Sequence, residues 1–288
     1  MNKRKRKATY VLVIPRFEDI FHSFYAGEII RGVSLSASRL NADFLIHITD
    51  RSDHRAWLDS TLMDRSYIDG IIFADIDNDL NVVKKALRNG MPCMVLNNII
   101  DDPINYVAVD NRIAAFKVTE QLIKLGHTKI ATIAGDQTTQ SGQMRLEGFN
   151  EAMKRHDLKV PNSYVTYGEF LRTPARQAAH HLLSLKDRPT AVFAASDVMA
   201  LELLDEAQKK HLTVPKDLSI IGFDNNPLGE TGVLKLSTVS QPLVEMGRLG
   251  AELLGQITKG KVRLPSKTTL PTKLLMRDTT APCKGKKE

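Results

Sequence analysis

Residues 189–241 read PTAVFAASDVMALELLDEAQKKHLTVPKDLSIIGFDNNPLGETGVLKLSTVSQ, and this stretch decides the fold class. An apolar run over residues 191–195 is followed by a helical pattern over 198–210 and by a second apolar run over 218–222. Short apolar runs are typical of buried strands, and apolar residues spaced by three and four are typical of a helix. The stretch therefore predicts a strand–helix–strand unit with parallel strands.

Polar residues stand where both expected strands end. Ser196 and Asp197 follow the first strand, and Asp224 follows the second. The carboxyl ends of parallel strands border the crevice where ligands bind, so we expect these three side chains to face one cleft. A Ser-Asp pair before an apolar helical pattern is also an N-cap signal, and this second interpretation stays open.

The same alternation of strands and helices recurs along the chain. Strands are expected at residues 10–14, 44–48, 70–74, 93–96, 106–109, 129–134, 164–166, 191–195, 218–222 and 273–276. Helices are expected at residues 29–40, 54–65, 81–89, 112–125, 142–155, 174–185, 198–210 and 243–258. This pattern predicts an α/β protein of two doubly wound parallel-sheet lobes, with about five strands in each sheet. The part after residue 241 is too short for a third domain, so we expect the chain to cross between the lobes more than once.

The charge of the chain is concentrated at its ends. The formal net charge is +7, of which residues 3–7 contribute +5 and residues 284–288 contribute +2. The remaining body is formally neutral, and its sequence shows no basic stripe for nucleic acid. A run of like charges is usually a solvated tail.

The sequence lacks the signals of several classes of protein. Cys93 and Cys283 are the two cysteines, so neither a disulfide framework nor a metal cluster is indicated, and a reducing compartment fits. No apolar stretch approaches the roughly 18 residues that span a membrane, and the first residues lack a cleavage site, so we expect a cytoplasmic protein. Neither a G-x-G-x-x-G motif after the first strand nor a phosphate-binding loop is present. We therefore expect no enzyme, no cofactor and no metal.

Five motifs, in order and at characteristic spacing, carry a resemblance to a known family. They are residues 109–135 (VDNRIAAFKVTEQLIKLGHTKIATIAG), 144–153 (MRLEGFNEAM), 189–201 (PTAVFAASDVMAL), 214–225 (VPKDLSIIGFDN) and 237–247 (STVSQPLVEMG). Over residues 10–278 the chain resembles the effector-sensing core of the LacI/GalR family of transcription regulators, which is related to the periplasmic sugar-binding proteins. The residues of these motifs resemble the cytidine-repressor branch most.

The resemblance implies two periplasmic-binding-protein-like lobes (type I), joined by three crossovers, with the effector between them. It implies a basic tail or linker at residues 1–9 and a second basic tail at 280–288. The N-terminal lobe would comprise residues 10–110 with 242–268, and the C-terminal lobe 111–241 with 269–279.

In the second lobe the resemblance implies an effector site. Arg145 matches the family arginine that grips effector hydroxyls, and Asp224 matches the carboxylate opposite it. Gln241 matches a polar residue of the sugar-binding relatives, while Ser196 stands where many members have Asn. A sugar or nucleoside offers hydroxyls at fixed angles, which suit the guanidinium fork, the carboxylate acceptors and an amide.

In the first lobe the resemblance implies three further effector-binding residues. Phe24 and Tyr25, expected in an aromatic loop, are near the position of ring-stacking aromatics, whose faces cover the apolar side of a sugar ring. Asn97 follows the fourth strand, where sugar-binding relatives often have a charged pair. The alternative for the aromatic residues is an ordinary place in the core.

Two residues have simpler interpretations that stay open beside the functional ones. Arg145 could pair with Glu147 or Glu151 on the helix surface, as an arbitrary arginine would. His127 follows Gly126 at the expected end of a helix, and we expect it to bond the last helix carbonyls rather than a metal.

The sequence thus predicts the sensing core of a transcription regulator, with a sugar or nucleoside as effector and allosteric signalling through a homodimer. Nine residues precede the first strand, whereas a helix-turn-helix needs roughly 20, so DNA contact would require a head outside this chain. The alternative function is the solute-binding receptor of an ABC importer, which would need an export signal.

Overall fold

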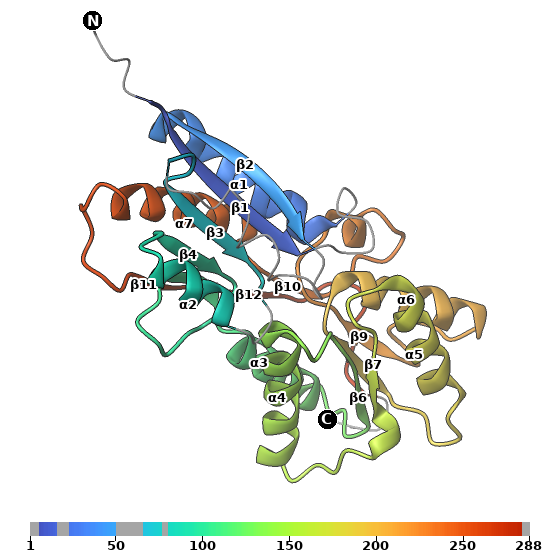
Figure 1. The fold of residues 1–288 in the computed structure, drawn as a ribbon. Coiled ribbons are helices and arrows are strands. Elements are labelled where there is room, and N and C mark those ends of the chain that lie inside the picture. Colours follow the sequence, from blue (N-terminus) through green and yellow to red (C-terminus); the bar gives the residue numbers. More distant parts are fainter. Residues whose placement is uncertain (1–5, 16–22, 50–65, 77–79, 284–288) are drawn as a thin grey trace, which may run out of the picture. The chain divides into compact units, whose positions relative to one another are not determined.

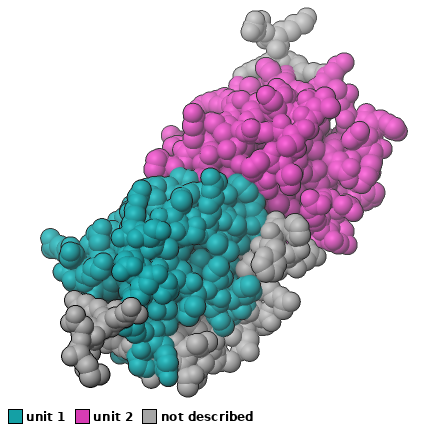
Figure 2. All heavy atoms as spheres, turned by 90° about the horizontal axis from the view of Figure 1, so that it is seen from above, with its two compact units in different colours: residues 1–109, 242–270 teal, residues 110–241, 271–288 magenta. Residues whose placement is uncertain are grey.

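The computed structural model describes residues 6–15, 23–49, 66–76 and 80–283. These residues form two compact units. Unit 1 comprises residues 1–109 with 242–270, and unit 2 comprises residues 110–241 with 271–288 (Figure 2). Each unit is an α/β structure in which helices pack on a parallel sheet, as the sequence predicts (Figure 1).

Unit 1 contains a six-stranded parallel sheet with strand order β11-β5-β4-β3-β1-β2. The strands are β1 (Ala8–Pro15), β2 (Ala42–Thr49), β3 (Gly70–Ala74), β4 (Cys93–Leu96), β5 (Tyr106–Val109) and β11 (Lys267–Leu270). The helices are α1 (Phe24–Leu40), α2 (Asn81–Arg88) and α7 (Leu243–Ile257).

The central strands of this sheet are buried on both faces, whereas the edge strand β2 has exposed side chains. Tyr10 and Leu12 of β1 belong to the core that includes α1 and α7, whereas Val11 and Val13 belong to the core that includes α2. Successive side chains of a strand point to opposite faces, so a central strand covered on both sides needs a continuous apolar run. Such runs made the central strands of unit 1 recognisable in the sequence.

Unit 2 contains a four-stranded parallel sheet with order β7-β6-β8-β9 and a short antiparallel pair, β10-β12. Its strands are β6 (Ile130–Ala134), β7 (Val165–Tyr167), β8 (Ala191–Ala194), β9 (Ser219–Ile221), β10 (Thr238–Ser240) and β12 (Lys273–Leu275). Its α-helices are α3 (Asn111–Lys124), α4 (Gln140–Arg155), α5 (Arg172–Ser184) and α6 (Asp197–Lys209), and its short 3-10 helices are η3 (Asn162–Tyr164) and η4 (Pro227–Glu230).

The structure corrects several sequence predictions. The sheets have six and four strands rather than about five each, because β11 joins the sheet of unit 1 beside β5. β11 and β10 escaped sequence analysis because they are short and β11 has the polar sequence KTTL, half of it exposed. Phe24 and Tyr25 form the first turn of α1, capped by Ser23, rather than a loop. The helix expected at 54–65 lies outside the described residues.

His127 is placed differently from the prediction. Its ring is buried and contacts the hydroxyls of Thr190 and Ser219 at 3.0 and 3.1 Å and the carbonyl oxygen of Ala281 at 3.1 Å. The backbone N–H of His127, not its ring, bonds a carbonyl of α3. The ring therefore holds the segment around Ala281 against the start of the sheet, and residues 280–283 are part of unit 2.

Among the described helices, none combines the length and apolar character that would let it cross a bilayer.

Candidate functional site

The turn after β9 places Asp224. The backbone N–H of Asp224 bonds the carbonyl of Val239 at 2.8 Å, and Asp224 forms an isolated parallel bridge with Ser240. Asp224 has φ 124 and the next residue, Asn225, has φ 60, so two successive non-glycine residues occupy left-handed backbone. Such conformations persist only where surrounding contacts impose them, and they gather at functional sites.

Arg145 lies on α4 and is 3% exposed. Its Nε donates to Oδ1 of Asn111 at 2.9 Å, and its Nη1 donates to the carbonyl oxygen of Ala195 at 2.6 Å. The guanidinium carbon lies 3.7 Å from the ring centroid of Phe223. These contacts hold the guanidinium group in one orientation. The interpretation of Arg145 as a surface residue is wrong because the residue is buried, and Glu151 pairs with Arg112.

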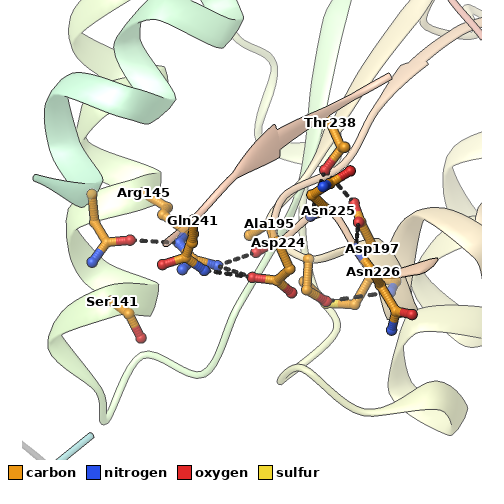
Figure 3. A network of polar contacts seen from close by, with 12 residues as sticks. Ser141, Arg145, Ala195, Asp197, Asp224, Asn225, Asn226, Thr238 and Gln241 are labelled. Atoms are coloured by element: carbon orange, nitrogen blue, oxygen red, sulfur yellow. Dashed lines mark hydrogen bonds and ion pairs between the residues drawn. The ribbon is translucent and has the colours of Figure 1, made fainter. Parts of the chain in front are cut away.

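Arg145 and Asp224 face one another (Figure 3). Nη1 of Arg145 lies 3.8 Å from Oδ1 of Asp224, which is longer than a hydrogen bond. Gln241 approaches the same carboxyl from the end of β10, and its Nε2 donates to Oδ1 of Asp224 at 2.6 Å. Oε1 of Gln241 is buried without a hydrogen-bond partner.

Burial dominates the electrostatics of the two acids in this network. Burial raises the pKa of Asp224 to about 7; the charge of Arg145 opposes this shift and the charge of Asp197 adds to it. Burial likewise raises the pKa of Asp197 to about 6, against hydrogen bonds from Thr238 and from the backbone of Asn226. Hydrogen bonding to a carboxylate favours its ionised form, so an effector hydroxyl that donates to Asp224 would lower the pKa of this residue.

Ser196 and Asp197 act structurally in unit 2. Oγ of Ser196 accepts from the backbone N–H of Met199, so Ser196 is the N-cap of α6, as the second interpretation of the sequence proposed. The Asp197 carboxylate accepts from the backbone of Asn226 at 2.7 Å and from the hydroxyl of Thr238 at 2.6 Å. Asp197 thus supports the turn that contains Asp224, whereas Ser196 caps α6 and keeps an O–H that can donate.

The other expected site residues belong to unit 1. Asn97 follows β4 with φ 65, its backbone N–H bonds Val107, and its side chain is 2% exposed. Oδ1 of Asn97 has no hydrogen-bond partner, and neither has Oδ1 of the buried Asn98. Phe24 and Tyr25 are half-buried and pack against the core below α1. Asn97 is thus a buried acceptor that the fold of unit 1 does not use.

Asn111 and Phe223 position Arg145 but were not selected from the sequence as site residues. Asn111 is the first residue of α3, directly after the N-cap Asp110, and Phe223 precedes Asp224. The only sequence feature that could have selected Asn111 and Phe223 was their position inside the motifs at residues 109–135 and 214–225. Within the described ranges, no group of three or more His, Cys, Asp or Glu side chains could hold a metal ion. The arrangement is suited to binding hydroxyl groups.

Comparisons with known proteins identify the family of the chain. The family "Periplasmic binding protein-like domain" matches residues 119–280. The HTH-type transcriptional regulator DegA of Bacillus subtilis is 31% identical, over 96% of this chain and 82% of DegA. The HTH-type transcriptional repressor CytR of Escherichia coli K12 is 33% identical, over 96% of this chain and 81% of CytR.

The chain belongs to the LacI/GalR family of transcription regulators. Among solved structures, a LacI/GalR regulator described as a CelR–cellobiose complex has TM-score 0.87 and 28% identity, covering 96% of this chain and 85% of that one. The lac repressor dimer bound to operator has TM-score 0.83 at 22% identity and shows the same fold. These LacI/GalR relatives are transcription regulators, so the chain is the core of a regulator rather than an importer receptor.

Proposed function

We propose that Arg145, Asp224 and Gln241 bind the hydroxyl groups of a small effector, a sugar or a nucleoside, and that the chain is the effector-sensing core of a cytoplasmic regulator. The 3.8 Å separation between Arg145 and Asp224 supports this proposal most strongly. A hydroxyl group that accepts from the guanidinium and donates to the carboxylate would satisfy both charged groups at once.

Gln241 adds a further acceptor to the proposed site. Its Nε2 is committed to Asp224, whereas its Oε1 is buried without a partner. A buried acceptor without a donor costs free energy, which an effector hydroxyl would recover on binding. Asn97 of unit 1 offers an acceptor of the same kind.

Phe24 and Tyr25 are proposed to contribute aromatic surface to the effector. Ser196 stays in the proposed site, because its hydroxyl oxygen caps α6 while its O–H can still donate to an effector. Sugars and nucleosides both stay in the proposal. One relative is described as a cellobiose complex, and the motifs are closest to the cytidine-repressor branch.

We further propose that the chain acts as a homodimer and reaches DNA through a helix-turn-helix, as the names of DegA and CytR indicate for those proteins. In a two-fold dimer, effector binding can alter DNA binding, because ligand-dependent changes within each subunit can remodel the shared interface. Sedimentation should show a dimer; a strict monomer at micromolar concentration, with and without effector, would contradict this part.

A thermal-shift screen tests the proposal with four compounds: cellobiose, ribose, cytidine and adenosine. A compound that binds the folded chain raises the melting temperature by mass action. Calorimetry with that compound should show binding weakened by about 100-fold in Arg145→Leu and in Asp224→Ala, because its buried hydroxyls lose a charged partner. The His127→Gln variant, which alters the other end of the sheet, should bind like wild type. Wild-type affinity in both site variants would refute the site.

A further inference from the structure

The turn that presents Asp224 is held from outside the proposed site. Asp224 and Asn225 both have left-handed backbone, with φ 124 and φ 60. A non-glycine residue leaves this region readily unless contacts oppose the change. The position of the Asp224 carboxyl opposite Arg145 therefore depends on whatever fixes Asn225.

Arg277, just after β12, supplies such a contact. Its Nη2 donates to Oδ1 of Asn225 at 2.8 Å, and its Nη1 donates to the carbonyl oxygen of Leu236 at 2.9 Å. Nη2 also pairs with Glu230 at 2.5 Å. The Arg277 side chain is 16% exposed, so its bonds to Asn225 and Leu236 are partly shielded from water, whereas the Glu230 carboxylate is exposed.

The backbone near Arg277 is fixed as well. The N–H of Arg277 donates to Oγ of Ser237 at 2.9 Å, and the N–H of Asp278 bonds the carbonyl of Lys235 at 3.0 Å. The guanidinium thus projects from an anchored segment and connects the β12 side of unit 2 with the turn after β9. A planar group with five donors can bond several acceptors in fixed directions, which a single ammonium group cannot do.

We propose that Arg277 is a positioning residue for the effector site: by bonding Asn225 it keeps the Asp224 carboxyl aimed at Arg145. The proposal rests on the proposed function, because it concerns the same site. Arg277 also pairs with Glu230, the last residue of η4. A simpler role for Arg277 would therefore be to hold η4 in place without affecting Asp224. The two roles differ in what they predict for the geometry of Asp224 and for binding.

The test uses the full chain and compares Arg277→Met with Arg176→Met. Arg176 forms two hydrogen bonds with the buried Glu202, at 2.9 and 2.8 Å, on helices α5 and α6 of the same unit. Both variants lose one positive charge and remove an arginine from a carboxylate, although Glu202 keeps Arg172 at 3.8 Å. Only Arg277 touches the turn. Crystal structures of the effector-free variants give the backbone angles of residues 224–225 and the distance from Arg145 to Asp224.

We expect Arg277→Met to shift the turn and to weaken binding of cytidine or cellobiose, whichever raises the wild-type melting temperature, by about tenfold more than Arg176→Met does. Arg277→Lys should bind with intermediate affinity, and Glu230→Gln should bind like wild type. Asn225→Gly removes the acceptor but tolerates the left-handed backbone, so Arg277→Met should have little further effect on affinity in that background.

An unchanged turn in Arg277→Met, with affinity no lower than that of Arg176→Met, would overturn the proposal. Additive effects of Arg277→Met and Asn225→Gly on affinity would also overturn it, since the two residues would then act independently. If wild type binds none of the four compounds, the proposed function fails, and the crystal structures alone decide whether Arg277 positions Asp224.

Discussion

Nε2 of Gln241 donates a 2.6 Å hydrogen bond to Oδ1 of Asp224, while Oε1 of the same amide has no partner. A Gln241→Leu substitution removes this unpartnered acceptor, whose burial costs about 1–3 kcal/mol. At pH 5 the variant should unfold in urea at the same or a higher concentration than wild type, although its effector affinity falls about tenfold or more. Lower stability together with unchanged affinity would show that Gln241 is a structural residue.

The Asp224 carboxyl makes stability depend on pH. Its pKa is raised from 3.8 to about 7 by burial, so the folded protein binds this proton more tightly than the unfolded chain does. The stabilisation is complete below about pH 4 and is lost as the pH rises through about 7, and Asp197, with a pKa of about 6, acts in the same direction. Urea unfolding at pH 5 and pH 8 should therefore show wild type losing a few kcal/mol relative to Asp224→Asn.

The control for this comparison is Asp205→Asn, which changes an exposed carboxylate paired with Lys209 on α6. Its stability should follow wild type across the same pH range. An Asp224→Asn variant with the same pH dependence as wild type would mean that Asp224 is ionised in the folded protein at pH 5.

His127 should give a pH dependence of opposite sign. Burial lowers its pKa, so the ring is stabilising when neutral, and this contribution is lost as the pH falls below about 6.5 and through the folded pKa. The carbonyl of Ala281 can only accept, so Nε2 carries the proton and Nδ1 accepts from Thr190. The protection of the Ala281 and Cys283 amides against hydrogen exchange, relative to the intrinsic rate at each pH, should fall between pH 7 and pH 5.5.

In His127→Ala the same two amides should exchange rapidly at every pH, while the amides of β6 stay protected. Slow exchange at Cys283 in this variant would mean that the hydrogen bond from its N–H to Leu125 holds the segment without the histidine.

Asn97 permits a test of the effector contacts proposed for unit 1. Its φ of 65 suits glycine, and its side-chain oxygen has no partner, so Asn97→Gly should change the free energy of unfolding by less than about 1 kcal/mol. Calorimetry with the compound found in the thermal screen should show affinity reduced by about tenfold. Wild-type affinity in Asn97→Gly would remove Asn97 from the site.

Packing between α1 and α7 in unit 1 depends on glycine. A Cβ on Gly32 would lie 2.1 Å from the carbonyl oxygen of Val244, and one on Gly247 would lie 2.5 Å from the carbonyl oxygen of Ile29 (Figure 1 shows the two helices). Gly32→Ala should therefore destabilise the protein by about 1–3 kcal/mol in urea unfolding, because backbone atoms must move apart.

Gly27→Ala is the matched control on the same helix. A Cβ there meets no atom within 4 Å, and alanine has the higher helix propensity, so this variant should be stabilised by up to about 1 kcal/mol. Equal effects at both positions would show that helix propensity, not the crossing of α1 and α7, decides the outcome.

The sequence by itself determined the α/β class, the alternation of elements and many of their bounds. Strands β3, β4 and β5 coincide with their expected ranges, because a strand buried on both faces must be apolar throughout. Helix α2 was recognisable because Gly90 follows it with φ 73. These features depend on neighbouring residues only, so they can be recognised from one sequence.

Arg145 and Asp224 were also selected from the sequence, by motif and by position at a strand end, and the structure brings them together. The sequence did not separate the two interpretations of Ser196, because a cap and a ligand have the same residue type at the same place.

Only the tertiary structure decided which polar groups are already used. Arg277 reaches Asn225 across 52 positions and His127 reaches Ala281 across 154. The placement of β11 beside β5 likewise depends on a partner more than 150 residues away. No local pattern reports such contacts, because hydrogen bonds between distant segments exist only after packing has brought the segments together. The family resemblance had already selected Gln241 and Asn97, but only the folded chain shows that each has a buried acceptor oxygen without a partner.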